Sequence, residues 1–85
     1  MSSTEAEIRA EIAKAMRKTG MPEDDIALAR SGTGRAISWR LQKFGAPIEL
    51  LALVGSWGDT LTDEELLHDL RRFNQTGSIF DEDIQ

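Results

Sequence analysis

The sequence predicts an all-α protein, folded as a compact bundle of four to five short helices. Hydrophobic residues recur at helical spacing nearly throughout the chain, and helix-capping patterns precede two of the hydrophobic segments. The chain has 85 residues and no cysteine, so it forms one small domain without a disulfide framework or a thiolate metal site. We expect this single helical domain to span residues 1–75, followed by an acidic, flexible tail at residues 76–85.

Two helices are predicted in the first third of the chain. The first begins near Glu5, because Thr4 and Glu7 have the spacing of a capping box. Gly20 follows its last turn, as is typical of helix ends. Its hydrophobic stripe consists of Ile8, Ile12, Ala15 and Met16. The second helix is predicted over "EDDIALAR", residues 23–30, because its three acidic residues suit a first turn.

The third helix is predicted over residues 35–44, after the turn "SGTG" at residues 31–34. Three hydrophobic residues recur at i, i+4 and i+7, which places them on one side of the helix, facing the core. They are Ile37, Leu41 and Phe44. Gly45 and Pro47 predict the end of this helix and the start of the next.

The fourth helix, within "PIELLALVGSW", is apolar on every side except at Glu49. A helix that is apolar all round is buried on all sides. In a domain this small, it is therefore either central or covered by a second subunit. The second alternative predicts a homo-oligomer interface, and the residues expected to form it are Leu50, Leu53, Val54 and Trp57.

The fifth helix is predicted over residues 63–74. Thr62 and Glu65 form a capping box, and Leu61 and Leu66 have the spacing of a hydrophobic staple. These two signals agree on where the helix begins. Its hydrophobic stripe consists of Leu66, Leu67, Leu70 and Phe73.

Charge is unevenly distributed along this chain of net charge −5. Residues 26–48 contain four basic residues and no acidic one, whereas residues 49–85 contain nine acidic and two basic residues. The side of the third helix that faces away from the core is predicted to contact a partner, since Trp and Arg are enriched at binding hot spots. The residues expected at this contact are Arg35, Ser38, Trp39, Gln42 and Lys43.

Two neighbouring side chains leave alternatives open. Trp39 either contacts a partner or packs against another helix near Trp57. Arg40 lies at the edge of the core stripe, where we expect it to pair with an acidic residue of the helix at 63–74.

The order of the second helix, the turn and the basic third helix resembles a helix-turn-helix unit around residues 23–44. In such motifs a small residue of the first helix packs against an apolar residue of the second, and Ala27 and Ile37 have about the right separation. The resemblance implies that the helix at 35–44 enters the major groove of DNA.

The sequence offers no catalytic constellation, so we expect that the protein is not an enzyme and uses no cofactor or metal. His68, the one histidine, is predicted on the solvent side of its helix. "SGTGR" shares only its glycines with phosphate-binding loops.

Two functions follow as hypotheses. The first is a small regulatory protein that acts by protein–protein contact, as an adaptor or an antagonist of a larger, nucleic-acid-handling machine, since its acidic half can bind a basic site. The alternative is a helix-turn-helix DNA-binding regulator. The N-terminus lacks the features of a signal peptide, and the longest apolar run is far too short to span a bilayer. We therefore expect a cytoplasmic protein that does not bind membranes.

Overall fold

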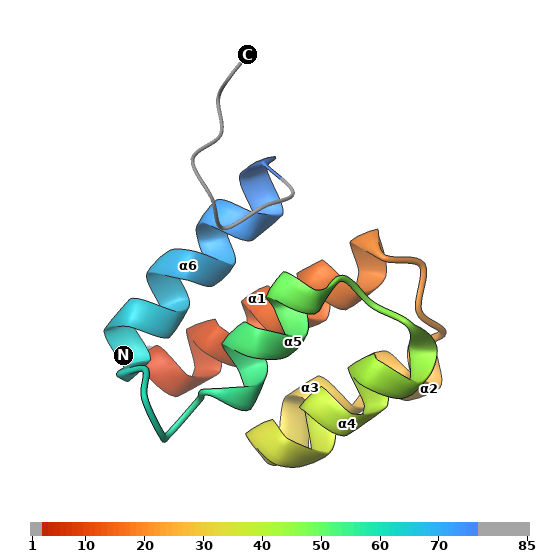
Figure 1. Cartoon of the computed structure of the whole chain (residues 1–85), viewed down its shortest axis with the longest axis horizontal. Helices are drawn as coiled ribbons and strands as arrows, with labels where there is room; N and C mark the ends of the chain where they lie inside the picture. Colours follow the sequence, from red (N-terminus) through yellow and green to blue (C-terminus); the bar gives the residue numbers. More distant parts are fainter. Residues whose placement is uncertain (1–2, 77–85) are drawn as a thin grey trace.

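The computed structural model describes residues 3–76, and within this range the regular secondary structure is helical. The elements are α1 (Thr4–Lys18), α2 (Glu23–Ile26), α3 (Leu28–Ser31), α4 (Gly34–Phe44), α5 (Ile48–Gly55) and α6 (Asp63–Thr76). They pack into a compact bundle (Figure 1), which confirms the predicted fold class. The tail predicted at 76–85 lies outside the described residues, apart from Thr76 at the end of α6.

The core is formed where these helices bring their hydrophobic stripes together. The predicted stripes of α1 and α6 are buried as expected. The buried hydrophobic residues are Ile8, Ile12, Ala15, Met16, Met21, Ile26, Ala29, Ile37, Leu41, Leu50, Leu53, Val54, Leu66, Leu67, Leu70 and Phe73. Every described helix contributes at least one of them, so the helices share a single core.

Helices α1 and α6 lie side by side (Figure 1). Polar side chains join them at the edge of the core. The buried Asn74 side chain donates from Nδ2 to the backbone oxygen of Glu11 at 3.0 Å and to its carboxylate at 2.8 Å. Arg71 forms an ion pair with Glu7 at 3.1 Å. These contacts connect residues that are more than sixty positions apart in the sequence, and so join the first helix to the last.

The ends of α1 and α6 show which capping signals are correct. The capping box predicted at Thr4 is wrong, because Ser3 caps α1: its Oγ accepts a hydrogen bond from the backbone N–H of Ala6 at 3.1 Å. The capping box of α6 is confirmed. The backbone N–H of Glu65 donates to Thr62 Oγ1 at 3.2 Å, and the N–H of Thr62 donates to the Glu65 carboxylate at 3.0 Å.

The predicted second helix is divided into α2 and α3 at Ala27. The backbone N–H of Arg30 bonds to the oxygen of Ala27, only three residues back, so the chain tightens at this join. Ala27 is exposed and Ala29 is buried, so the expectation that Ala27 packs against Ile37 is wrong. Whether this unit acts as a helix-turn-helix stays a prediction.

Helices α4 and α5 form an antiparallel pair joined by a short turn (Figure 1). Gly45 makes this reversal possible, since its φ of +93° lies in the left-handed region that favours glycine. Phe44 was expected in the core, but its side chain is 43% exposed. It is the last residue of α4, where the chain turns away, and its side chain is left exposed.

A first prediction concerns the capping of α6. Replacing Thr62 with alanine removes the oxygen that accepts the Glu65 N–H, so it should lower the free energy of unfolding by about 1 kcal/mol. Urea unfolding followed by circular dichroism measures this loss. Thr60→Ala is the matched control, since Thr60 is exposed in the same loop and should change stability by less than about 0.5 kcal/mol. Equal losses in the two variants would contradict the capping role.

Candidate protein-contact surface

The orientation of α4 is fixed by its buried side and its first turn. Ile37 and Leu41 are completely buried. At the N-terminus, Thr33 Oγ1 accepts a hydrogen bond from the backbone N–H of Ala36 at 3.1 Å. The opposite side of the helix consequently faces solvent. Four of the five residues predicted to contact a partner are exposed there: Arg35, Trp39, Gln42 and Lys43.

Ser38, the fifth residue predicted at the contact, is half-buried between α4 and α5. Its hydroxyl donates to the backbone oxygen of Leu51 at 3.4 Å. Its Oγ would lie 3.2 Å from a Cβ added at Gly55. The prediction of a partner contact at Ser38 is therefore corrected: this side chain packs one helix of the protein against the next.

Small residues let α4 and α5 approach each other closely. At the N-terminus of α4, a Cβ added to Gly34 would lie only 3.0 Å from the backbone oxygen of Val54. One turn later, the Ser38 side chain lies close to Gly55, where an added Cβ would be 3.2 Å from Ser38 Oγ. Because the two helices are this close, their solvent-facing sides adjoin and form one surface.

The predicted homo-oligomer interface at Leu50, Leu53 and Val54 is also corrected. These three side chains are at most 4% exposed within one chain, so they have no surface to offer a second subunit. They occupy the side of α5 that faces the core. Trp57, the fourth residue of that prediction, is half-buried in the loop after α5.

The outward side of α5 is an apolar stripe that we expected to be covered. Its residues recur at i, i+3, i+4 and i+7 and are Ile48, Leu51, Ala52 and Gly55. Ile48 is 78% exposed, Ala52 and Gly55 are also exposed, and Leu51 is half-buried. This spacing can be found in the sequence. Because the rest of the helix is also apolar, however, the sequence does not distinguish the exposed side of α5 from the buried side.

Together, the outward residues of the two helices define what we call the α4–α5 surface. It consists of Arg35, Trp39, Gln42, Lys43, Ile48, Leu51, Ala52 and Gly55. Its apolar residues are Trp39 and those of α5, and its basic and polar groups come from α4. Protein contact surfaces commonly combine a hydrophobic centre with a polar rim.

Trp39 is the largest residue of this surface. Its side chain is 56% exposed, and the Lys43 ammonium lies 5.0 Å from the centre of its ring. Trp57 lies elsewhere, with its indole N–H donating to Asp63 and the Arg9 guanidinium over its ring. The alternative in which Trp39 packs against a helix near Trp57 is therefore wrong.

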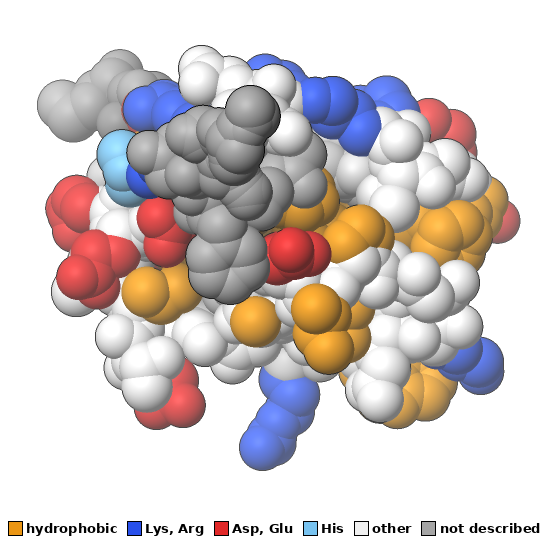
Figure 2. Space-filling model, turned by 45° about the horizontal axis from the view of Figure 1, so that its top comes forward, with side chains coloured by type: hydrophobic (Ala, Val, Ile, Leu, Met, Phe, Trp, Pro, Cys, Tyr) orange, Lys and Arg blue, Asp and Glu red, His pale blue; other side chains and the backbone are white. Residues whose placement is uncertain are grey.

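Several acidic and basic side chains are paired on the folded protein. Arg40 forms its ion pair with Asp25 of α2 at 2.6 Å, and not with an acidic residue of α6 as expected. On α6 the exposed acidic residues lie beside His68, which is exposed as predicted. Figure 2 shows this gathering around the histidine, with most of the exposed hydrophobic side chains on the other half of the same face.

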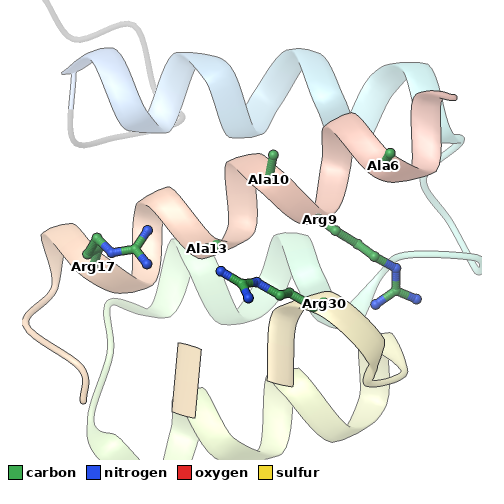
Figure 3. A pocket seen from close by; sticks show the side chains of 6 residues that line it. All are labelled: Ala6, Arg9, Ala10, Ala13, Arg17 and Arg30. Carbon is green, nitrogen blue, oxygen red and sulfur yellow. The ribbon is translucent and has the colours of Figure 1, made fainter. Parts of the chain in front are cut away.

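A hollow between α1 and α3 is the other concave feature of interest (Figure 3). It is lined by Ala6, Arg9, Ala10, Ala13, Arg17 and Arg30. Arginine stays protonated in proteins and cannot act as a general base. With only arginine and alanine side chains, this hollow lacks a nucleophile and a proton acceptor, so it gives no support to catalysis.

Arg9 at the edge of this hollow has a structural role. Its Nη1 donates to the backbone oxygens of Ala29 at 3.2 Å and Gly32 at 2.7 Å, and its Nε donates to Glu5 at 3.0 Å. Through these bonds α1 holds the end of α3 and the turn that leads into α4. The position of α4 in the bundle therefore depends on Arg9.

Within residues 3–76 no group of three or more His, Asp or Glu side chains could hold a metal ion. No helix in this part of the chain has the length and hydrophobicity needed to cross a membrane. Comparison with family models, curated proteins and solved structures gives no match.

A second prediction tests the role of Arg9. Arg9→Met keeps most of the side-chain stem but leaves two backbone oxygens without their charged donor, so the free energy of unfolding should fall by about 1–3 kcal/mol. Arg30→Met is the matched control, because Arg30 is exposed in the same hollow and should cost less than about 0.5 kcal/mol. Urea unfolding measures both variants. A loss at Arg30 equal to that at Arg9 would mean that the bonds to α3 are not what stabilises the fold.

Proposed function

We propose that this protein is a small, non-catalytic interaction protein that acts by binding another protein through the α4–α5 surface. The observation that carries the proposal is the apolar stripe exposed along α5, together with the exposed Trp39 on the solvent side of the neighbouring α4. Exposed hydrophobic surface that gathers in one place marks interaction sites, whereas scattered single residues do not. Of the three large hydrophobic residues exposed in residues 3–76, Trp39 and Ile48 belong to the α4–α5 surface and Phe44 lies outside it.

The chemistry of the surface suits binding energetics. Covering apolar surface contributes about 25 cal/mol for each Å² removed from water, and a bulky exposed side chain such as Ile48 can be covered only by a partner. A few central Trp, Tyr and Arg residues usually account for most of the affinity of an interface. Trp39 and Arg35 are residues of these types, and Lys43 over the ring favours a defined orientation of Trp39.

The acidic side chains gathered on α6 support a role as an adaptor or an antagonist in the cytosol. The acidic side chains of Glu64, Glu65 and Asp69 gather beside His68 on α6 and can face a basic site on a larger assembly. Such a basic site can be one that otherwise holds nucleic acid. In this account the α4–α5 surface provides the affinity, and the acidic residues guide the approach of the partner.

DNA binding by α4 is the alternative, favoured by Arg35, Gln42 and Lys43 on one exposed helix side. Two observations weigh against it. Arg40 is already neutralised by Asp25, and α2, which would lie near the DNA backbone, begins with the acidic residues Glu23, Asp24 and Asp25. The apolar stripe of α5 would also gain little from a phosphate backbone.

A third prediction tests the contact surface. A Trp39→Ser, Ile48→Ser double variant should lose the protein partner captured from host lysate by the wild-type chain, because both side chains would be central to the interface. Both residues are exposed, so circular dichroism should show an unchanged fold.

Phe44→Ser is the matched control, since Phe44 is exposed at the end of α4, more than 100° round the helix from Trp39, and should keep the partner. Partners retained by the double variant would contradict the proposal. A separate titration with duplex DNA at about 50 and about 200 mM salt tests the alternative, since a DNA-binding protein should lose affinity by orders of magnitude over that range. No binding at the lower salt concentration excludes it.

A further inference from the structure

The hollow between α1 and α3 gathers positive charge over a floor of alanine. It has a volume of about 420 Å³, and its lining consists of arginine and alanine side chains. Arg17 of α1 and Arg30 of α3 extend into it from two sides, and their guanidinium groups point toward each other across Ala13 (Figure 3). We propose that this hollow is a binding site for a phosphate monoester group. The site goes beyond the proposed function, because none of its residues belongs to the α4–α5 surface.

Arg30 supplies a positive charge that no other group in residues 3–76 offsets. Its side chain is exposed, and it forms no hydrogen bond or ion pair with the described residues. Long charged side chains normally keep their head groups in water, and like charges that approach each other repel. An anion between Arg17 and Arg30 would replace this repulsion with two attractive contacts.

Arg17 has a partner that is easily displaced. Its Nη2 lies 3.3 Å from a carboxylate oxygen of Glu23, whose side chain is 74% exposed. Ion pairs at such exposed positions contribute little to stability, so Glu23 can turn into solvent when another anion reaches Arg17. A ligand with a single negative charge would only replace one carboxylate with another. A ligand with two negative charges would gain from Arg17 and Arg30 together.

Arg9 builds the hollow but is engaged elsewhere. Its Nη1 donates to the backbone oxygens of Ala29 and Gly32, and its Nε donates to Glu5. These bonds hold α3 against α1. They therefore fix the separation of the two helices that present Arg17 and Arg30, and leave those two side chains to bind a ligand.

Two convergent arginines suit a phosphate monoester better than a carboxylate. A guanidinium group binds an oxyanion through two parallel N–H donors, so a single arginine occupies both oxygens of a carboxylate. A phosphate monoester presents three oxygens and carries a charge of about −1.5 to −2 at pH 7, so it can bridge arginines from two helices. The short alanine side chains leave room for it and add no competing acceptor. They also exclude water from one side of the contact, which strengthens the attraction between charges.

Titration of the ¹⁵N-labelled protein with methyl phosphate, followed by nuclear magnetic resonance, tests the site. At a constant ionic strength of about 150 mM, the amide signals of Ala13 and Arg30 should shift and saturate, with a dissociation constant of about 1 mM. Acetate should bind about 10-fold more weakly, since it has one charge and two oxygens. The absence of a saturable shift at these residues, or acetate binding as tight as that of methyl phosphate, would overturn the proposal.

Substitutions test whether the two arginines hold the ligand. Arg17→Gln and Arg30→Gln should each weaken the binding of methyl phosphate by about 10-fold, because each removes a pair of charged donors. Glu23→Gln should tighten binding by about threefold, since it removes the group that competes for Arg17. Arg35→Gln is the matched control, because it removes the same charge from α4, outside the hollow, and should leave the dissociation constant unchanged.

The four substituted side chains are all exposed, so circular dichroism should show an unchanged fold in every variant. Equal losses of affinity in Arg30→Gln and Arg35→Gln would overturn the proposal, because binding would then follow the net charge of the protein and not the hollow.

A phosphoserine peptide distinguishes two sources of the phosphate monoester. A short peptide with one phosphoserine between alanines is titrated in parallel with methyl phosphate. Binding about 10-fold tighter than that of methyl phosphate would assign the ligand to a modified protein, and binding no tighter would assign it to a small phosphorylated molecule. Both results support the site, whereas failure of both ligands to bind would overturn it. Neither outcome bears on the α4–α5 surface, which the Trp39→Ser, Ile48→Ser variant tests separately.

Discussion

The close approach of α4 and α5 is the constraint on which the account of this protein depends. Small residues at three points of contact, Gly34, Ser38 and Gly55, make it possible. A larger side chain at Gly34 would meet the backbone oxygen of Val54, which cannot move without disturbing α5. The two helices therefore act as one unit, and their outward sides form a single surface in place of two narrow ones.

The small size of the domain explains why that surface remains open. Helix α5 is apolar nearly all round, yet α4, the core and the following loop can cover only part of its circumference. A domain this short buries a limited fraction of its surface, so an apolar helix in it will have an uncovered side unless another molecule supplies the cover. The exposure of Ile48 has this origin, and the proposed protein partner would cover it.

Much of the fold could be predicted from the sequence because the responsible signals are local. The hydrophobic stripes of α1 and α6, the capping box at Thr62 and the glycine at position 45 act within a few residues of themselves. The partner of Arg40, the burial of Ser38 and the exposure of Ile48 depend instead on which helices become neighbours. No local pattern specifies that choice. The sequence therefore indicated which side of α4 is exposed, and did not indicate which side of α5 is exposed.

Oxidative footprinting of the native protein tests most directly whether a protein covers the α4–α5 surface. The two tryptophans provide an internal ratio: in dilute purified protein, the exposed Trp39 should be oxidised faster than the half-buried Trp57. In host extract, where a partner is present, the oxidation of Trp39 should fall while that of Trp57 stays the same. An unchanged ratio of the two rates in the extract would contradict the account, since Trp39 would then face solvent in the setting where the protein acts.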